Sequence, residues 1–408
     1  MRAPHTLVTL LVAAALAAAA LACEDGRQAA PTAPASATVP LALDHGRMTV
    51  EVEFLRPDGS VRPARAWVDL GSEHVAVGET LARDLGLDLS VLDMQPAEAI
   101  KAAPQCPPLR VGGFALDVSG VTAIVRGGER WRPGVVAEAM LPASALRRHH
   151  LVLDYPARRM TVAHPGALRP RGAAVPCRVN PDTGLLQVDA TVDGRAVALG
   201  VDNGSAGTWV SSALTGELLQ RHPDWPRATG AAGSTNFWGI SVETAGTLVR
   251  LPEVGVGSLR VRDVVALGIE PALIEWYSRK SAGTVAGFLG ANVLTRFRLE
   301  IDYPGRMTYW EEGAENGLRD LDIVGLTVRA ETDGRFTVAG VTTTNGAPAV
   351  AGVDAGDALL RVGTLDTAGA TMGAVIDALR GVPGETRTLV LDRQGRRVTV
   401  EARVTRLP

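Results

Sequence analysis

The pentapeptide Val-Asp-Leu-Gly-Ser at residues 68–72 returns as Val-Asp-Asn-Gly-Ser at residues 201–205. Each copy is followed, at a similar distance, by an aliphatic residue and Asp-Tyr-Pro, at residues 153–156 and 301–304. A repeat unit of this length is a whole domain rather than one turn of a solenoid. The sequence therefore predicts two homologous lobes in one chain.

The bulk composition predicts a mainly β protein of several domains. A chain of 408 residues exceeds the usual size of a single hydrophobic core, so two or three domains are expected. Its 45 glycines, 25 prolines and many short Val/Leu runs are typical of strands joined by turns. A net charge of -3 gives no basic surface for phosphates, so we expect no nucleic-acid partner.

In both halves a hairpin carries an aspartate to the end of a strand. Residues 49–55 alternate as a strand, and a glycine-containing turn leads into a second strand that ends at Asp69. Residues 186–192, an Asp-Gly turn and residues 196–201 repeat this order before Asp202. We therefore expect the two aspartates to occupy equivalent places.

These motifs resemble the aspartic peptidases of the pepsin and retropepsin kind. Residues 201–211 are similar to that family's Asp-Thr-Gly-Ser loop and the strand after it. Residues 287–294, Gly-Phe-Leu-Gly-Ala-Asn-Val-Leu, are similar to its apolar-apolar-Gly segment. In the first lobe an apolar strand and helix follow over residues 75–87. The resemblance implies two β-barrel lobes, and because both lie on one chain, the active site needs no homodimer.

The resemblance implies an endopeptidase that cleaves polypeptides, with Asp69 and Asp202 as the catalytic pair. Two carboxyl groups about 3 Å apart cannot both ionise, so they share a proton. One then acts as base on a water and the other as acid, and activity is expected at acid pH. The supporting residues that the resemblance implies are Gly71, Ser72, Gly204, Ser205 and Gly290.

Departures from the family pattern keep a second hypothesis open. Active members carry Thr or Ser between the Asp and the Gly, and its hydroxyl reaches the opposite loop. Leu70 cannot make that bond, and Asn203 could make it only with altered geometry. In the first lobe Ala139 and Pro142 stand where the second has glycines. The alternative is a catalytically impaired pseudo-peptidase that binds extended peptides or partner C-termini.

No motif indicates a cofactor or a metal. The adjacent pair His149 and His150 has the wrong spacing for one metal-binding helix face, so core or solvated roles are expected. Phe237 and Trp238 could line a flap over the cleft, although packing is the more ordinary role for such aromatics.

The N-terminus predicts export. Arg2 precedes an apolar stretch, residues 7–22, that is short for a membrane span and ends in small residues. The Ala-Leu-Ala-Cys junction resembles a bacterial lipobox, which implies cleavage before Cys23 and a lipid anchor on it; simple secretion is the alternative. We therefore expect a protein of the bacterial cell envelope, in the periplasm or at the outer surface. Residues 23–40, rich in Ala, Pro, Thr and Ser, predict a flexible tether.

Two further cysteines leave two alternatives open. If Cys23 carries lipid, Cys106 and Cys177 remain as an even pair in an oxidising compartment, where a disulfide would persist. They could equally be two buried thiols, since sequence does not give their separation.

The last 90 or so residues resemble bacterial PDZ domains. Within residues 345–360 a small-Pro-Ala turn, expected to open a short helix, precedes a Gly-Asp pair and an apolar strand. An amphipathic helix at residues 372–379 and strands at 387–392 and 398–404 follow that family's order. The predicted parts of the chain are a signal peptide at 1–22, a tether at 23–40, lobes at 41–170 and 171–312, and a PDZ-like α+β domain at 318–408.

The PDZ resemblance implies a peptide groove between a strand and the helix. A ligand would bind there by strand addition. A PDZ-like fold used only for packing is the alternative. The residues that best match the family's approach loop are Val324, Gly325, Leu326 and Thr327.

Overall fold

Strands make up most of the regular structure, which confirms the predicted mainly β fold. The computed structural model describes residues 34–94, 98–126, 137–234, 242–313, 321–331 and 333–408. The predicted export signal, Cys23, Phe237 and Trp238 lie outside them. Residues 35–408 form one compact unit. Within the described part of the chain, no helix is both long enough and apolar enough to span a bilayer.

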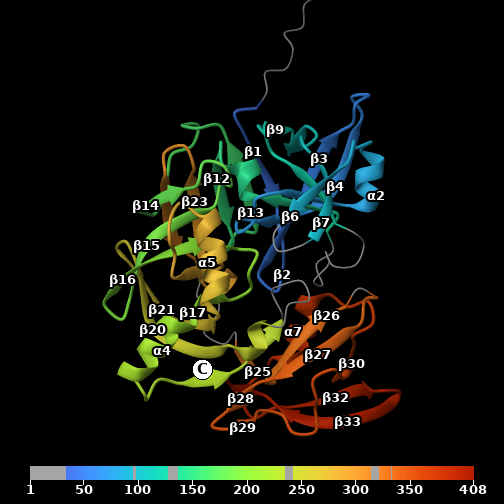
Figure 1. Cartoon of the computed structure of the whole chain (residues 1–408), viewed down its shortest axis with the longest axis vertical. Coiled ribbons are helices and arrows are strands. Elements are labelled where there is room, and N and C mark those ends of the chain that lie inside the picture. Colours follow the sequence, from blue (N-terminus) through green and yellow to red (C-terminus); the bar gives the residue numbers. More distant parts are fainter. Residues whose placement is uncertain (1–33, 95–97, 127–136, 235–241, 314–320, 332) are drawn as a thin grey trace, which may run out of the picture. The chain divides into compact units, whose positions relative to one another are not determined.

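Lobe 1 is a barrel-like sheet with two short helices, coloured blue to teal in Figure 1. The predicted hairpin is formed by β3 and β4, and its Gly59 has φ 81°. The elements are β2 (Ala42–Asp44), β3 (Arg47–Leu55), β4 (Val61–Asp69), β5 (Val75–Gly78), α2 (Glu79–Asp84), β6 (Ser90–Met94), β7 (Glu98–Ala103), β8 (Leu109–Val111), β9 (Phe114–Leu116), β10 (Ala123–Arg126), β11 (Ala139–Pro142) and α3 (Ala143–Leu146).

Lobe 2 has the same plan, coloured green to yellow. Its hairpin of β15 and β16 turns at Asp193 and Gly194, both with positive φ. The elements are β15 (Leu186–Val192), β16 (Arg195–Val201), β17 (Thr208–Ser211), α4 (Ser212–Arg221), β18 (Arg227–Thr229), β19 (Gly233–Ser234), η1 (Val242–Ala245), β20 (Thr247–Val256), β21 (Leu259–Ile269), α5 (Pro271–Lys280), β22 (Gly287–Leu289) and α6 (Ala291–Leu294).

The two lobes repeat one pairing scheme around the aspartate loops. In lobe 1, β11 is parallel to β4 and antiparallel to β5. In lobe 2, β22 is parallel to β16 and antiparallel to β17. The next strand is equivalent too, since β10 runs parallel to β5 and β21 parallel to β17. The sequence repeat is therefore a repeat of the fold.

Strands from both halves form a shared sheet in the order β1-β13-β12-β23-β24-β14. The halves meet where β12 pairs antiparallel with β23, with Leu153 opposite Leu299. The repeated Asp-Tyr-Pro segments open the turns of two equivalent hairpins, in which Arg158 and Arg306 have φ 55° and 54°. The strands are β1 (Ser36–Pro40), β12 (His150–Asp154), β13 (Arg159–Ala163), β14 (Ala173–Val179), β23 (Phe297–Asp302) and β24 (Met307–Glu312).

The predicted tether is wrong at its C-terminal end. Instead of continuing to residue 40, it gives way to β1, which pairs with β13 from Ser36 opposite Ala163 to Pro40 opposite Arg159. The Thr38 and Thr161 hydroxyls also hydrogen-bond at 2.8 Å. Backbone pairing with an existing sheet edge thus orders a segment whose composition favours a tether.

The adjacent histidines have core roles. His149 Nε2 accepts a hydrogen bond from the Asp117 N–H at 3.0 Å. His150 Nε2 lies 2.7 Å from a carboxylate oxygen of Glu300 across the β12–β23 pair, and Arg298 donates to the same carboxylate at 2.6 Å. Both rings are buried, and each ring has a protein partner.

The possible disulfide is absent, because Cys106 and Cys177 are separate buried thiols. Cys106 Sγ contacts the carbonyl oxygen of Pro107 at 3.3 Å in lobe 1, whereas Cys177 lies on β14 opposite Val188. Burial raises the pKa of both thiols to about 12. The alternative of two buried thiols is therefore the one that the structure supports.

The C-terminal unit, coloured orange to red in Figure 1, has a hydrophobic core of its own between a sheet and α7. Helix α7 has the bounds that the periodicity predicts, and β32 and β33 contain most of the predicted strands. The elements are β25 (Asp322–Ile323), β26 (Leu326–Ala330), β27 (Phe336–Val341), β28 (Thr343–Thr344), β29 (Ala347–Pro348), β30 (Ala358–Val362), β31 (Leu365–Asp366), α7 (Met372–Leu379), β32 (Thr386–Arg393), β33 (Arg396–Arg403) and β34 (Thr405–Arg406).

The short helix expected after Pro348 is not formed; residues 349–357 are turns, bends and irregular backbone. Gly352 and Gly356 have φ 78° and 95°, which a right-handed helix cannot contain. The Gly-Asp pair does lead into a strand, β30, as predicted.

Both lobes contact the C-terminal unit. Asp44 on β2 accepts hydrogen bonds from the Thr371 hydroxyl at 2.7 Å and the Gly373 N–H at 2.9 Å, at the start of α7. A carboxylate at this position also interacts favourably with the helix dipole. From lobe 2, β18 pairs with β28 through Thr229 and Thr343. The unit is thus held by a strand pair and by a helix cap.

Candidate active site

The structure brings the two predicted aspartates together at the ends of β4 and β16. Each lies against the glycine of the opposite loop: a Cβ atom at Gly71 would overlap the Asp202 carboxyl group, and one at Gly204 would overlap that of Asp69. Both aspartates keep part of their surface exposed. Glycine is therefore needed in each loop to leave room for the opposite carboxyl group. This requirement is separate from any need for glycine to let the backbone turn.

The two carboxyl groups receive unequal support from the backbone. Asp202 Oδ1 accepts the N–H of Gly204 at 2.9 Å and that of Ser205 at 3.3 Å. Among the described residues, the backbone donor to Asp69 Oδ1 is the N–H of Gly71 alone, at 2.9 Å. Hydrogen bonds of this kind stabilise the ionised form, so Asp202 carries the charge more readily.

Burial raises the pKa of both aspartates above its usual range. For Asp69 the rise is large, because repulsion from Asp202 adds to burial. Backbone donors limit the rise at Asp202, and a hydrogen bond between the two side chains favours the proton on Asp69. The pair is therefore arranged to hold one proton, on Asp69.

The side chain of Asn203 links the two loops by two hydrogen bonds. Its Oδ1 accepts the N–H of Leu70 at 2.8 Å, and its Nδ2 donates to the carbonyl oxygen of Val68 at 3.0 Å. One amide thus provides both an acceptor and a donor across the lobes. Leu70 is fully buried in the core and returns no such bond. Half of the reciprocal arrangement expected for a symmetric pair of loops is present.

The segments behind the loops differ between the lobes as the sequence indicates. In lobe 2, Cβ atoms at Gly287 and Gly290 would overlap the carbonyl oxygens of Trp209 and Gly207. Ala139 and Gly287 occupy equivalent positions. Each pairs with the residue that lies three places before the aspartate on the neighbouring strand. Lobe 1 therefore accommodates a side chain at this position, where lobe 2 has no room for one.

The first loop nevertheless keeps its backbone anchor. The N–H of Ala143 donates to the carbonyl oxygen of Ser72 at 3.1 Å, as that of Ala291 does to Ser205 at 2.8 Å. The Ser205 hydroxyl donates to the carbonyl oxygen of Gly207 at 2.7 Å, so it braces the loop. The contact between the aspartate loop and the helix that follows is therefore present in both lobes, although lobe 1 lacks the glycines of lobe 2.

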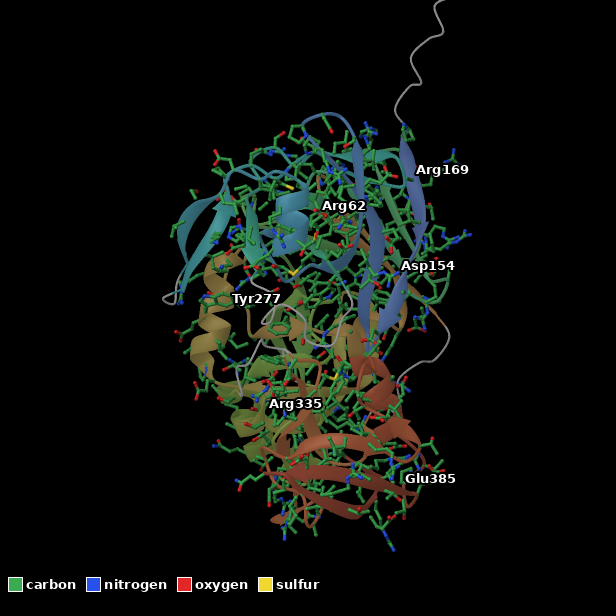
Figure 2. The ribbon with its side chains drawn as sticks, turned by 90° about the vertical axis from the view of Figure 1, so that its right-hand side faces the viewer. Arg62, Asp154, Arg169, Tyr277, Arg335 and Glu385 are labelled. Carbon is green, nitrogen blue, oxygen red and sulfur yellow. The ribbon has the colours of Figure 1, made fainter. Side chains whose placement is uncertain are left out.

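Two tyrosines near the pair were not found by sequence reasoning. Tyr277, labelled in Figure 2, is buried on α5 and packs against Gly200, two residues before Asp202. Burial and the nearby carboxylates raise its pKa. Tyr155 is buried beside Asn203. The repeated Asp-Tyr-Pro motif was the available signal for Tyr155, whereas nothing local indicated Tyr277.

A buried arginine also lies near the pair. Arg47 on β3 precedes Met48, which pairs with Val68, and its guanidinium lies 5.9 Å from the centre of the Trp67 ring. Burial lowers its pKa to about 10, so it stays cationic at neutral pH. Its charge opposes the rise of the Asp69 pKa. The sequence did not indicate this role, because Arg47 looks like any charged residue at the start of a β-strand.

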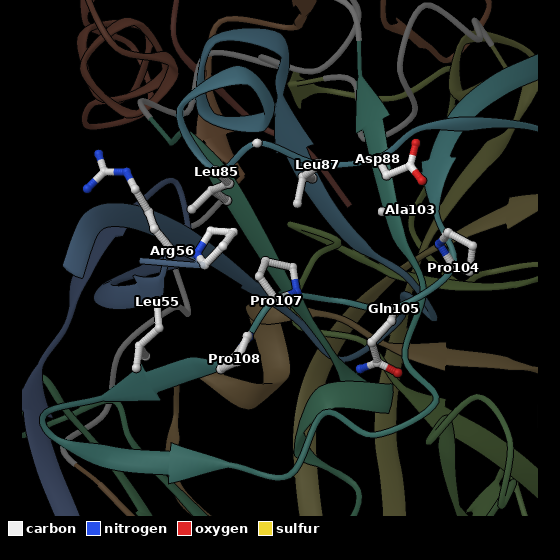
Figure 3. A pocket seen from close by; sticks show the side chains of 12 residues that line it. Leu55, Arg56, Leu85, Leu87, Asp88, Ala103, Pro104, Gln105, Pro107 and Pro108 are labelled. Atoms are coloured by element: carbon white, nitrogen blue, oxygen red, sulfur yellow. The ribbon is translucent and has the colours of Figure 1, made fainter. Parts of the chain in front are cut away.

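Two hollows lie close to the lobes without including either aspartate. One, of about 630 Å³, is bordered by the strand after Ser205, by α6 and by α7. The other, of about 610 Å³, is on lobe 1 and is shown in Figure 3. Its rim is made largely of prolines and leucines: Leu55, Pro57, Leu85, Leu87, Pro104, Pro107 and Pro108.

The residues predicted to bind peptide in the C-terminal unit are buried. Val324, Leu326 and Thr327 have at most 1% of their surface exposed, and a Cβ atom at Gly325 would overlap Ala349. Thr327 pairs with Gly233 of lobe 2. The structure therefore brings this segment against lobe 2. Within the described ranges, no group of three or more His, Cys, Asp or Glu side chains could hold a metal ion.

Comparison with solved structures finds a likeness to the aspartic proteinase from Irpex lacteus. The TM-score is 0.43 and the sequence identity is 11%, over 69% of this chain and 98% of that chain. No protein-family model matches the sequence, and no curated protein matches it. The likeness is a distant one.

Asn203→Ala should destabilise the protein, because it leaves the buried Leu70 N–H and Val68 carbonyl without their cross-lobe partner. Each unpaired group costs about 1–3 kcal/mol. Urea unfolding would measure the loss. The control Leu70→Met keeps volume and every cross-lobe bond and should cost less than about 1.5 kcal/mol. Equal losses in the two variants would contradict this role for Asn203.

The stability of Asp69→Asn relative to wild type should increase as pH rises. The folded-state pKa of Asp69 is above its unfolded value, so its contribution to stability is complete below about pH 4 and is lost as pH rises through the folded pKa. The slope is at most about 1.4 kcal/mol per pH unit. Urea unfolding from pH 4 to 8 would test this. The exposed control Asp189→Asn should track wild type, and a constant difference for Asp69→Asn would refute the prediction.

Proposed function

We propose that this protein is an aspartic endopeptidase acting on extended polypeptides. The observation that carries the proposal is the reciprocal packing of Asp69 on Gly204 and Asp202 on Gly71 at the ends of equivalent strands. It is supported by the unequal backbone donors, which separate the two carboxyl groups into an acid and a base.

In the proposed mechanism, Asp202 is the general base and Asp69 the general acid. A water molecule attacks the scissile carbonyl carbon while Asp202 takes its proton. Asp69 gives its proton to the carbonyl oxygen, so the tetrahedral intermediate is neutral. Asp202 then gives its proton to the leaving nitrogen and the C–N bond breaks. Asp69 takes a proton from a hydroxyl group of the intermediate, which becomes the new carboxyl group, so the pair again holds one proton on Asp69. Neither aspartate needs a metal or a cofactor for these steps.

The raised pKa values of Asp69 and Asp202 shift the pH range of activity that the sequence predicts. The acid limb of activity follows the Asp202 pKa and the alkaline limb follows the higher Asp69 pKa, as macroscopic values of the pair. Since both move upward, the active range lies at higher pH than two ordinary carboxyl groups would give. Mildly acidic to neutral pH is therefore expected.

The second candidate function is a pseudo-peptidase that binds extended peptides between the lobes without cleaving them. Leu70 is the observation that favours it, because it removes one half of the bonding between the loops. Precise positioning dominates the rates of such reactions, so a loosened pair could bind without cleaving.

The site of action is a separate proposal. The Ala-Leu-Ala-Cys junction supports export and a lipid anchor on Cys23, in the bacterial cell envelope. A membrane-tethered peptidase of this kind would meet other exported polypeptides as substrates or as peptide ligands.

Cleavage of a denatured protein substrate should show a bell-shaped pH profile. Asp69→Asn and Asp202→Asn should each lower the rate by about 10²–10⁴-fold, because either removes the state with one shared proton. Asp189→Asn, an exposed carboxylate, should leave it unchanged. Leu70→Thr should raise the rate if the missing cross-lobe bond limits it.

The outcome that decides between the candidates uses a statine-type peptide. A folded protein that binds this peptide, hydrolyses no substrate between pH 3 and 8, and binds equally well with either Asn substitution would replace the peptidase by the pseudo-peptidase.

Metabolic labelling with a fatty acid should label the mature chain and not a Cys23→Ser variant. The variant should also leave the membrane fraction, because the thioether that carries the lipid cannot form. If labelling and fractionation were the same for both, the protein would be simply secreted.

A further inference from the structure

Three charged residues lie in a row across neighbouring strands of lobe 1. Asp44 pairs with Arg47 at the end of the β2–β3 hairpin. On the other side of β3, Met48 pairs with Val68. The next residues of these two strands are Arg47 and Asp69, which therefore stand at the same level. Residues directly opposite each other in an antiparallel pair have their side chains on one face of the sheet. The row thus runs from Asp44 through Arg47 to Asp69.

The place of the Arg47 side chain agrees with this register. Trp67 lies two residues before Asp69 on β4, so both side chains are on the same face. The Arg47 guanidinium lies 5.9 Å from the centre of the Trp67 ring. Because Arg47 is fully buried, water screens its charge only weakly, and the charge acts strongly on its neighbours.

The outer member of the row is fixed by the C-terminal unit. Asp44 Oδ1 accepts hydrogen bonds from the Thr371 hydroxyl at 2.7 Å and from the Gly373 N–H at 2.9 Å, both at the start of α7. A Cβ atom at Gly373 would overlap Asp44 Oδ1, so the helix approaches this carboxylate closely. Figure 1 shows β2 reaching α7. The same carboxylate therefore caps α7 and stands beside Arg47.

Asp44 needs Arg47 as well as the helix. Its Oδ2 atom is buried and makes no hydrogen bond with the described residues. A buried charge of this kind needs a counter-charge. Of the carboxylates that attract Arg47, Asp44 acts most strongly, followed by Glu243 and Asp69. The charge of Arg47 is thus shared among several carboxylates, one of which belongs to the catalytic pair.

The other titratable groups around the row come from four elements. Burial and the charges of Arg47 and Arg380 lower the pKa of His45, so this ring adds no charge at neutral pH. The described groups whose charges act on the row or on the pair are Glu243 on η1, Asp202 on the opposite loop, Tyr277 on α5 and His45 in the β2–β3 turn.

We propose that Arg47 is a positioning residue for the catalytic pair, and that Asp44, held by α7, sets how strongly Arg47 acts on Asp69. Arg47 favours the ionised form of Asp69, whereas the Asp44 carboxylate opposes it by attracting Arg47 and repelling Asp69. Because α7 donates to Asp44, the C-terminal unit takes part in setting the charge of the pair. The inference rests on the proposed function for the role of the pair, but its test needs no cleavage.

The test follows the titration of Asp69 in the full chain. Aspartate labelled with ¹³C at the side-chain carboxyl carbon gives resonances that move when a proton is lost. Comparison with Asp69→Asn and Asp202→Asn assigns the resonances of the pair. The readout is the pH midpoint of the upper titration step, which is a macroscopic value of the pair. It is measurable in a protein that cleaves nothing, so failure of the peptidase proposal is distinguishable from failure of this one.

Two substitutions should move this midpoint in opposite directions. Arg47→Met removes the positive charge and should raise the midpoint by about one pH unit or more. Arg47→Lys keeps the charge and should restore most of the wild-type value. Asp44→Asn keeps an oxygen that can accept from α7 but removes the negative charge, so the midpoint should fall by about half a pH unit.

A matched control is an ion pair further along the same two strands. Arg65 Nε lies 2.9 Å from Glu51 Oε1 on exposed surface, and these residues are directly opposite each other. Glu51→Gln should leave the midpoint unchanged. Urea unfolding would show that each variant is folded. Opposite shifts from Arg47→Met and Asp44→Asn cannot come from a general loosening of the fold.

A double-mutant cycle tests the part played by α7. Thr371→Val removes one donor from Asp44 and leaves its charge less neutralised, so the midpoint should rise by roughly 0.3 pH unit. In an Asp44→Asn background the same substitution should have no effect, because the charge on which it acts is gone. Equal midpoints for wild type, Arg47→Met and Asp44→Asn would overturn the proposal. So would a Thr371→Val shift that is absent, or one that persists with Asp44→Asn.

Discussion

The close approach of two carboxyl groups is the constraint on which the rest of this structure depends. Asp69 and Asp202 each occupy the space above the glycine of the opposite loop, so the two loops pack directly against each other. Bringing two such groups together is unfavourable unless they share a proton, and unequal backbone donors decide which of them keeps it. The strands β1, β13, β12, β23, β24 and β14 of the sheet shared by both halves, together with the Asn203 amide, join the two lobes.

Much of the fold could be predicted because its signals are local. Alternation predicts the strands that end in the aspartates, glycine positions predict the hairpin turns, and helical periodicity predicts α7. The structure has these elements at the predicted positions. The end of the tether and the segment after Pro348 were predicted wrongly. In the first, pairing with β13 overrides a disordered composition. In the second, two glycines with positive φ prevent the helix.

The candidate site could be predicted only in part, because some of its members come from distant segments. Asp69 and Asp202 are marked by a repeated motif. Arg47 and Tyr277 lie near them through packing between elements far apart in sequence, and no local pattern distinguishes them from ordinary strand or helix residues. The two-residue strand β19 is too short to produce any periodicity, so its addition to β26 is visible only in the folded chain.

The hydrogen bonds of Asn203 make the two aspartate loops asymmetric. Two identical subunits would have to carry the same residue in both loops, so they could not combine one amide with one leucine. A chain that contains both lobes is free of that requirement. One loop can supply the polar group while the other supplies hydrophobic packing. Joining the lobes in one polypeptide thus allows each half of a formerly equivalent pair to specialise, and the difference between Leu70 and Asn203 is a direct mark of that freedom.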